Sequence, residues 1–210
     1  GTENNRWACI KDLSRPFVVQ GGVSGANADY SWIDVNNRSA FQRATELFLD
    51  LGHTRIALIN GLESMDFALR RRKGFCAALQ DRGIVVDDSL MFSDEMTELY
   101  GYDCAMALLG RQDAPTAFLV SSMISAIGVR RAVEENGLIM GKDVSVITHD
   151  DELSYLRNGR DIPIFTATRS SVREAGKIAA QMLLDRIRNP QMAASTTLLE
   201  AQLMLGRSTG

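Results

Sequence analysis

Residues 70–73 (Arg-Arg-Arg-Lys) form a dense basic cluster that follows a short polar loop in the sequence. A guanidinium group carries five fixed N–H donors and no acceptor, so it can bind neighbouring hydroxyls or a carboxylate through several directed hydrogen bonds. Four consecutive helical residues cannot share one face, because each residue turns the helix by about 100°. We therefore expect at least one of these side chains to point inward toward an oxygen-rich ligand. The alternative is that the cluster is a solvated helix face.

The segments around this cluster alternate as the elements of an open α/β sheet do. Gly52 ends one predicted helix, residues 55–60 (Arg-Ile-Ala-Leu-Ile-Asn) read as a short buried strand, residues 61–66 form a loop, and a second helix follows. Ligands of open α/β sheets bind at the edge where the strands have their carboxyl ends. The first interpretation is therefore a fold that binds or senses a small molecule.

Three further polar side chains are predicted near the carboxyl ends of strands. Asp150 follows a strand predicted over residues 144–148, and its carboxylate can accept hydrogen bonds from sugar hydroxyls. The alternative role for Asp150 is to cap a helical turn predicted over residues 151–156. Ser122 can cap the helix that follows it and offer one hydroxyl, and Arg169 is either a second cationic ligand group or a surface residue.

The aromatic residues and the histidines offer weaker candidates. Phe67 and Trp32 could cover the apolar face of a sugar ring, although Trp32 could equally belong to the core. Asn37 is predicted to cap a helix first and to line the site second. His149 lies beside the predicted carboxylate ligand, which suggests acid–base chemistry, whereas His53 follows a helix end and is expected to pack or cap. Two histidines without a nearby cysteine or a carboxylate pair do not form the pattern of a metal site.

Predicted strands and helices alternate along almost the whole chain. This alternation predicts right-handed βαβ crossovers, a mainly parallel sheet and the α/β fold class. A helix capped by Asn36 carries the apolar stripe Phe41, Ala44, Phe48 and Leu51, and the next helix opens at Ser64 or Asp66 and stops near Gly83. The other predicted helices cover residues 98–109, 124–135 and 172–189, and the strands cover residues 16–20, 55–60, 89–92, 116–121, 144–148, 164–168, 196–199 and 202–205.

Charge and composition narrow the class of protein. The 210 residues have a formal net charge of −3 and a pI of about 5.5, so no global basic field is present for nucleic-acid binding by this chain alone. No apolar run approaches the roughly 18 residues that a membrane span needs, and no signal peptide is visible. Cys9, Cys76 and Cys104 are odd in number and widely spaced, which favours free thiols in a reducing, cytoplasmic environment.

Six motifs that occur in order resemble the LacI/GalR family of bacterial transcription regulators, and the likeness covers nearly the whole chain. They are residues 52–57 (Gly-His-Thr-Arg-Ile-Ala), 71–75 (Arg-Arg-Lys-Gly-Phe), 113–117 (Asp-Ala-Pro-Thr-Ala), 126–128 (Ala-Ile-Gly), 143–151 (Asp-Val-Ser-Val-Ile-Thr-His-Asp-Asp) and 206–209 (Gly-Arg-Ser-Thr).

The resemblance implies a periplasmic-binding-protein-like fold of two lobes with mainly parallel sheets, an effector in the cleft between them, and a homodimer. Residues 1–84 are expected to be the C-terminal part of the N-terminal lobe, residues 85–162 the C-terminal lobe, and residues 163–210 the crossover back with a long helix and closing strands. The first lobe looks incomplete. A helix-turn-helix domain, through which a full family member binds operator DNA, is absent from this sequence, which is therefore expected to be N-terminally truncated.

The resemblance also implies roles for individual residues. Arg71 aligns with an effector-contacting arginine of the family, and Asp150 aligns with an aspartate that accepts hydrogen bonds from effector hydroxyls. Ser122 and Met123 stand where many relatives have Asn-Asp, which changes the hydroxyl pattern that the site can read. Arg169 stands where relatives often have glutamine.

Ile127, Tyr155 and Leu156 lie on elements that form the dimer face in this family, although ordinary core packing would explain them equally well. The expected function is the effector-sensing and dimerisation core of a LacI-type transcriptional regulator, with a saccharide as the effector. The alternative is a periplasmic sugar-binding protein of a transport system. An enzyme is not expected, because no nucleophile–base pair, phosphate loop or metal cluster is present, and no cofactor is expected either.

Overall fold

The computed structural model describes residues 15–21, 30–150, 152–153 and 155–210, and it divides the chain into two compact units. Unit 1 holds residues 1–35 and 171–199, and unit 2 holds residues 36–170 and 200–210. The chain therefore crosses from one unit to the other three times. The predicted two-part α/β organisation with mainly parallel sheets is confirmed, whereas the predicted boundary near residue 84 does not match these units, because strands on either side of it belong to one sheet.

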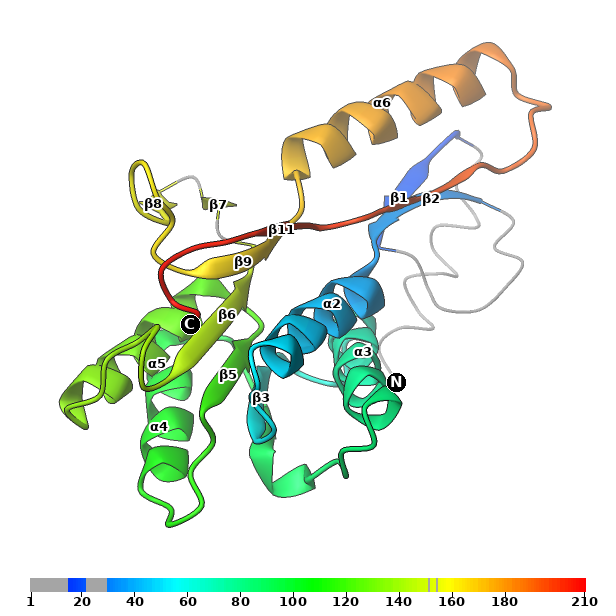
Figure 1. Ribbon diagram of the computed structural model, residues 1–210. Helices are drawn as coiled ribbons and strands as arrows, with labels where there is room; N and C mark the ends of the chain where they lie inside the picture. The colour runs from blue at the N-terminus through cyan, green and yellow to red at the C-terminus, as the bar shows by residue number, and fades with distance from the viewer. Residues whose placement is uncertain (1–14, 22–29, 151, 154) are drawn as a thin grey trace. The chain divides into compact units, whose positions relative to one another are not determined.

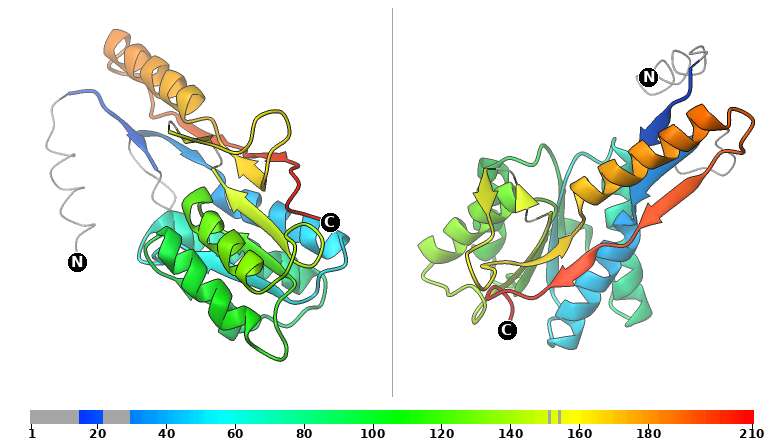
Figure 2. Two further views of the ribbon diagram at one scale, coloured as in Figure 1. Left: turned by 90° about the vertical axis from the view of Figure 1, so that its left-hand side faces the viewer. Right: turned by 90° about the horizontal axis from the view of Figure 1, so that it is seen from above.

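In the described residues of unit 1, a parallel three-stranded sheet packs against a long helix. The strands β1 (Val18–Gln20), β2 (Ser31–Val35) and β10 (Thr196–Leu199) lie in the order β1-β2-β10, and α6 (Val172–Arg188) packs along β1 and β2 (Figure 2). Ser171 caps α6 by accepting a hydrogen bond from the backbone N–H of Glu174. Strand β2 was not predicted from the sequence. In the structure Ser31 and Ile33 are buried while Trp32 between them is half-buried, which is the alternation typical of a strand.

Unit 2 is built on a six-stranded sheet in the order β11-β9-β6-β5-β3-β4 (Figure 1). Five strands are parallel to one another and β11 is antiparallel to β9. The elements of unit 2 are α2 (Asn37–Asp50), β3 (Ile56–Asn60), α3 (Asp66–Asp81), the 3₁₀ turn η1 (Asp88–Leu90), β4 (Met91–Ser93), α4 (Glu98–Leu109), β5 (Ala117–Val120), α5 (Met123–Glu135), β6 (Ser145–His149), β9 (Thr166–Arg169) and β11 (Gln202–Met204).

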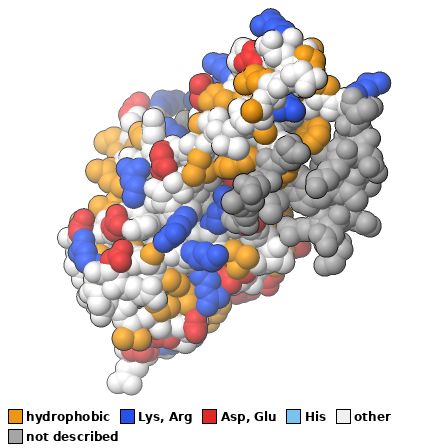
Figure 3. Space-filling view, turned by 90° about the vertical axis from the view of Figure 1, so that its right-hand side faces the viewer, with side chains coloured by type: hydrophobic (Ala, Val, Ile, Leu, Met, Phe, Trp, Pro, Cys, Tyr) orange, Lys and Arg blue, Asp and Glu red, His pale blue; other side chains and the backbone are white. Residues whose placement is uncertain are grey.

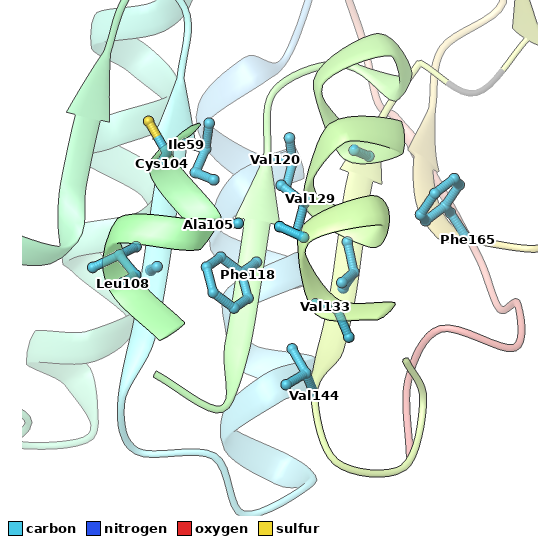
Figure 4. Close-up of a cluster of buried hydrophobic side chains, with 14 of the residues drawn as sticks. Ile59, Cys104, Ala105, Leu108, Phe118, Val120, Val129, Val133, Val144 and Phe165 are labelled. Carbon is cyan, nitrogen blue, oxygen red and sulfur yellow. The ribbon is translucent and has the colours of Figure 1, made fainter. Parts of the chain in front are cut away.

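Helices cover both faces of the unit 2 sheet, with α2 and α3 on one side and α4 and α5 on the other (Figure 1). The core beneath α4 and α5 gathers aliphatic side chains around Phe118 of β5, as Figure 4 shows. All four residues of β5 and all five of β3 and of β6 are buried. This pattern is typical of central parallel strands that are covered on both faces.

The predicted helical turn over residues 151–156 is wrong. Among the described residues, Glu152 and Leu153 form β7 (Glu152–Leu153), which pairs antiparallel with β8 (Leu156–Arg157). Asp150 therefore does not start a helix, and the alternative role as a helix cap falls away. Asp151 itself lies outside the described residues.

No helix among the described residues is long and apolar enough to cross a membrane. Cys104 is buried and Cys76 is half-buried, and both are free thiols, while Cys9 lies outside the described residues. Burial raises the pKa of the Cys104 thiol to about 11. A thiol with a raised pKa is a poor nucleophile, which fits a packing role.

Basic and acidic side chains lie interspersed on the described part of the face in Figure 3.

His53 packs where α2 ends, as the sequence predicted. Its Nδ1 and Nε2 lie 2.8 Å from Thr116 Oγ1 and 2.9 Å from Ser145 Oγ, and its ring meets Phe48 edge-on with centroids 5.6 Å apart. Burial lowers the pKa of His53 below its ordinary value of 6.5. The neutral imidazole is therefore the form that the fold favours.

We expect His53 to contribute to a loss of stability in mild acid. Because the unfolded chain binds the proton more readily, the stability of the folded chain is unaffected by His53 above about pH 6.5 and decreases as the pH drops below it. Urea unfolding of the wild type and of His53→Gln at pH 7.5 and pH 5.5 measures the effect. The variant should lose less stability between the two pH values than the wild type. An equal loss in both proteins would contradict the assignment.

Candidate functional site

The carboxyl edge of the unit 2 sheet gathers the polar groups that the sequence singled out. The parallel strands β3, β5, β6 and β9 all end at this edge, so the residues that follow them become neighbours. Asn60 at the end of β3 accepts a hydrogen bond from the Ser121 hydroxyl (2.8 Å) and donates its amide N–H to the carbonyl of Ala68 (2.9 Å). These bonds tie the start of α3 to the sheet and so position Arg71 one turn further along.

Arg71 is the inward-pointing member of the basic cluster, as expected, with only 6% of its surface exposed. Its Nε donates to Asn37 Oδ1 (2.8 Å) and its Nη1 donates to the carbonyl of Ser121 (3.0 Å). Arg70 and Arg72 instead pair with surface carboxylates, those of Asp66, Glu63 and Asp88. Because each residue turns the helix by about 100°, Arg71 points inward while Arg70 and Arg72 point toward the surface.

Two phenyl rings contact the Arg71 guanidinium. Its Cζ lies 4.7 Å from the ring centre of Phe67 and 5.1 Å from that of Phe41. Both distances are within the range in which a cation is attracted to a ring face. A Cβ on Gly61 would lie 3.3 Å from the Phe67 ring and 3.2 Å from Met96 Sδ, so Met96 and Phe67 converge above Gly61. The predicted aromatic residue Phe67 thus lies beside the predicted cation.

Asp150 forms the second charged group at this edge and lies just after β6. Its Oδ1 accepts hydrogen bonds from the Ser170 hydroxyl (2.7 Å) and the Ser170 N–H (3.3 Å), and its Oδ2 lies 3.3 Å from His149 Nε2. His149 is 1% exposed, and its Nδ1 lies 2.7 Å from Thr168 Oγ1. These contacts give His149 a supporting position beneath the carboxylate.

The Asp150 carboxylate is ionised over the whole physiological pH range. Burial by itself would raise its pKa, but the hydrogen bond and charge of His149, the Ser170 hydroxyl and the charge of Arg71 lower the pKa to about 2. An ionised carboxylate only accepts hydrogen bonds, which suits hydroxyl donors. Asp150 has a φ of 51°, the only positive value among the described non-glycine residues, and aspartate is one of the few side chains that tolerate it.

The remaining predicted ligand residues are less closely gathered. Ser122 caps α5 by accepting a hydrogen bond from the N–H of Ser125, as expected. Arg169 is half-buried at the end of β9. Trp32 is half-buried in β2 and belongs to unit 1, whereas the other candidates belong to unit 2. The structure therefore brings together Arg71, Phe67 and Asp150 with Ser122 on a neighbouring strand end.

Two of the predicted dimer-face residues also pack inside unit 2. Ile127 and Leu156 are partly buried against the core beneath α4 and α5. Tyr155 in the β7–β8 turn is 78% exposed. A dimer contact through these residues stays a prediction, with Tyr155 as the side chain that has most surface to offer.

The sequence predicted Asn37 as a helix cap first and as a residue lining the site second, and it gave no prediction of Phe41 or Ser170 as site residues. Asn37 is buried and binds Arg71, and the helix cap is its neighbour Asn36, which accepts a hydrogen bond from Ser39 N–H. Phe41 is 0% exposed and lies one turn after Asn37. The i, i+4 spacing of these two residues on an apolar helix face was the available signal. Ser170 carried no such signal. No group of three or more metal-ligating side chains occurs in the part of the chain that the structure describes.

A sequence profile described as periplasmic binding protein-like domain matches residues 45–209, which is most of the chain. The chain belongs to the periplasmic-binding-protein-like family. The matched segment contains the strands and loops that carry Arg71, Ser122, Asp150 and Arg169, so the candidate site lies inside the family's domain.

Named relatives confirm the predicted resemblance to LacI/GalR regulators. The chain is 43% identical over 201 residues to the HTH-type transcriptional regulator AglR of Rhizobium meliloti (strain 1021), which covers 96% of this chain and 56% of the relative. The relatives carry the names of transcriptional regulators, in agreement with the expectation that the protein is not an enzyme. The chain spans little more than half the length of these relatives.

Solved structures show the same fold. A complex of the transcriptional regulator CelR with cellobiose has a TM-score of 0.81 at 27% identity, over 92% of this chain and 58% of that chain. A regulatory protein of the LacI family from Chloroflexus aggregans has a TM-score of 0.87 at 25% identity, over 99% of this chain and 73% of that chain. The fold is therefore that of LacI-family regulators.

Proposed function

We propose that this chain is the effector-sensing and dimerisation core of a LacI-type transcriptional regulator, and that its effector is a saccharide. The observation that carries the proposal is that a buried arginine and an aspartate carboxylate lie at the same carboxyl edge of the unit 2 sheet, where the charge of Arg71 helps to lower the pKa of Asp150. A guanidinium donates and a carboxylate accepts, so together they recognise hydroxyls, which can do both. We assign the apolar contact with a sugar ring to Phe67, whose ring also contacts the Arg71 guanidinium.

The relatives support this reading. CelR, which is similar to this chain, is a transcriptional regulator whose structure contains cellobiose. Arg71, Asp150, Ser122, Arg169, Phe67 and Trp32 remain the proposed effector-binding residues, and Ile127, Tyr155 and Leu156 the proposed dimer residues. The alternative, a periplasmic sugar-binding protein of a transport system, finds no support among the named relatives.

In the proposed mechanism the effector binds one conformation of the protein better than another and shifts the population toward it. In the parent protein, operator DNA is bound through a helix-turn-helix domain. The effector would change the affinity for operator DNA by at most the ratio of its own affinities for the two conformations. A cytoplasmic location follows from this proposed role, because operator DNA lies there.

A thermal-shift screen tests the proposal directly. Maltose, trehalose, sucrose and cellobiose, with monosaccharides and sugar phosphates alongside, are added to the folded chain. A saccharide at about 100 times its dissociation constant should stabilise the protein by roughly 2.7 kcal/mol, an easily measured shift. A shift with one saccharide supports the proposal. No shift with any of them, in a sample that unfolds cooperatively, counts against a saccharide effector.

A further inference from the structure

We propose that Asn37 and Phe41, one turn apart on α2, are positioning residues that fix the guanidinium of Arg71 for effector recognition. The inference rests on the proposed function, because it assigns these residues a role in ligand binding. Asn37 is 4% exposed and Phe41 is 0% exposed. Neither offers surface to a ligand, so their contribution to binding passes through Arg71.

Fixing a long arginine side chain in one conformation has a cost in free energy. A free arginine side chain loses rotamer entropy when it is fixed in one conformation. If folding has already fixed the side chain, the ligand does not meet that cost when it binds. The bond from Arg71 Nε to Asn37 Oδ1 (2.8 Å) and the bond from Nη1 to the Ser121 carbonyl (3.0 Å) define the plane of the guanidinium. Asn37 is the side chain that binds the Nε edge of the Arg71 guanidinium.

The ring of Phe41 contacts both Arg71 and His149, the histidine that lies beneath the Asp150 carboxylate. Its centre lies 5.1 Å from Arg71 Cζ and 5.8 Å from the centre of the His149 ring, at an interplanar angle of 53°. His149 in turn lies 3.3 Å from the Asp150 carboxylate. One buried ring therefore sets the spacing between the cation and the group that supports the anion.

Helix α2 is itself held firmly against its neighbours in unit 2. A Cβ on Gly74 of α3 would lie 2.1 Å from the carbonyl oxygen of Arg38, so the backbones of α2 and α3 are in direct contact beside Asn37. Asn36 caps α2, and Arg43 donates a hydrogen bond to the carbonyl of Ala201 (3.1 Å). Asn37 on α2 and Arg71 on α3 are thus held in a register that leaves little room to slide.

Calorimetric titration of the 210-residue chain with maltose, trehalose, sucrose and cellobiose tests the proposal. Asn37→Leu removes the acceptor and Phe41→Leu removes the ring face, and each should raise the dissociation constant about tenfold or more. Asn37→Asp keeps the acceptor and should stay within about threefold of the wild type. Phe48→Leu is the matched control, because Phe48 is an equally buried phenylalanine further along α2, beside His53.

A ligand-independent measurement separates this inference from the proposed function. The Nε–Hε signal of Arg71 in a ¹⁵N NMR spectrum, assigned by its loss in Arg71→Lys, should exchange slowly with solvent in the wild type. The Hε proton should exchange faster in Asn37→Leu, and the chemical shift of the signal should change in Phe41→Leu. Neither the exchange rate nor the chemical shift should change in Phe48→Leu. Unchanged exchange in Asn37→Leu would overturn the proposal, as would unchanged sugar affinity. An ordered Arg71 signal that responds as expected, in a protein that binds none of the sugars, supports positioning and counts against the saccharide function alone.

Discussion

Replacing Gly128 with alanine should destabilise unit 2 by about 3 kcal/mol or more. A Cβ at this position of α5 would lie 2.0 Å from the carbonyl oxygen of Glu98 and 2.7 Å from the backbone nitrogen of Tyr102, both in α4. Both obstacles are backbone atoms, which cannot swing aside as a flexible side chain can. The methyl group would therefore force the two helices apart over the core that they cover. Urea unfolding followed by circular dichroism measures the loss.

Gly110→Ala is the matched control for this prediction. Gly110 lies at the C-terminal end of α4 in the same unit, with a right-handed φ of −74°, and the nearest atom to an added Cβ is Met106 O at 3.4 Å. We expect the stability of this variant to stay within about 1 kcal/mol of the wild type. If Gly128→Ala were as stable as Gly110→Ala, the close contact between α4 and α5 would be disproved.

The second large effect is expected at Arg71. Arg71→Met keeps a long apolar side chain between Phe41 and Phe67 but removes the cation and its hydrogen bonds to Asn37 and Ser121. The saccharide-dependent stabilisation, roughly 2.7 kcal/mol at 100 times the dissociation constant, should disappear. The ligand-free protein should also lose about 1 to 3 kcal/mol, because buried acceptors lose their charged donor. Thermal unfolding with and without the saccharide measures both changes.

Arg72→Met is the control, because Arg72 is the next residue in the chain but lies at the surface, whereas Arg71 is buried. The Arg72 side chain is 38% exposed and pairs with Glu63 and Asp88 on the surface. Such ion pairs contribute at most about 1 kcal/mol. The saccharide-dependent shift should be preserved in this variant. A preserved shift in Arg71→Met as well would remove Arg71 from the proposed binding site.

The local rules that govern helices explain why most elements were predicted well. The predicted and observed limits of α4 agree at Glu98–Leu109, because Thr97 is a cap and Gly110 an end that can be read from neighbours in the sequence. Ser122 before α5 and Asn36 before α2 work in the same way. Each of these signals depends on residues within a few positions of one another.

The elements that were missed depend on distant partners. β2 becomes a strand through pairing with β1 on one side and with β10, more than 150 positions away, on the other. The β7–β8 pair, which replaces a predicted helical turn, is the exception, because it joins residues only three to five positions apart. The unit boundary was misplaced because β3 pairs with β5 across the position where composition suggested a break. Strand pairing of this kind leaves almost no trace in local sequence.

The candidate site also has features that the local sequence predicts and features that depend on contacts between distant residues. Helix periodicity alone determined that at least one member of the 70–73 cluster must face inward, and the strand–loop pattern placed Asp150 at the carboxyl edge of the sheet. Only the tertiary structure decided that Asn37 and Phe41 hold Arg71 and that Ser170 holds Asp150. The physical reason is reach: a turn of helix relates residues three or four positions apart, whereas these contacts join residues 20 to 34 positions apart through the packing of whole elements.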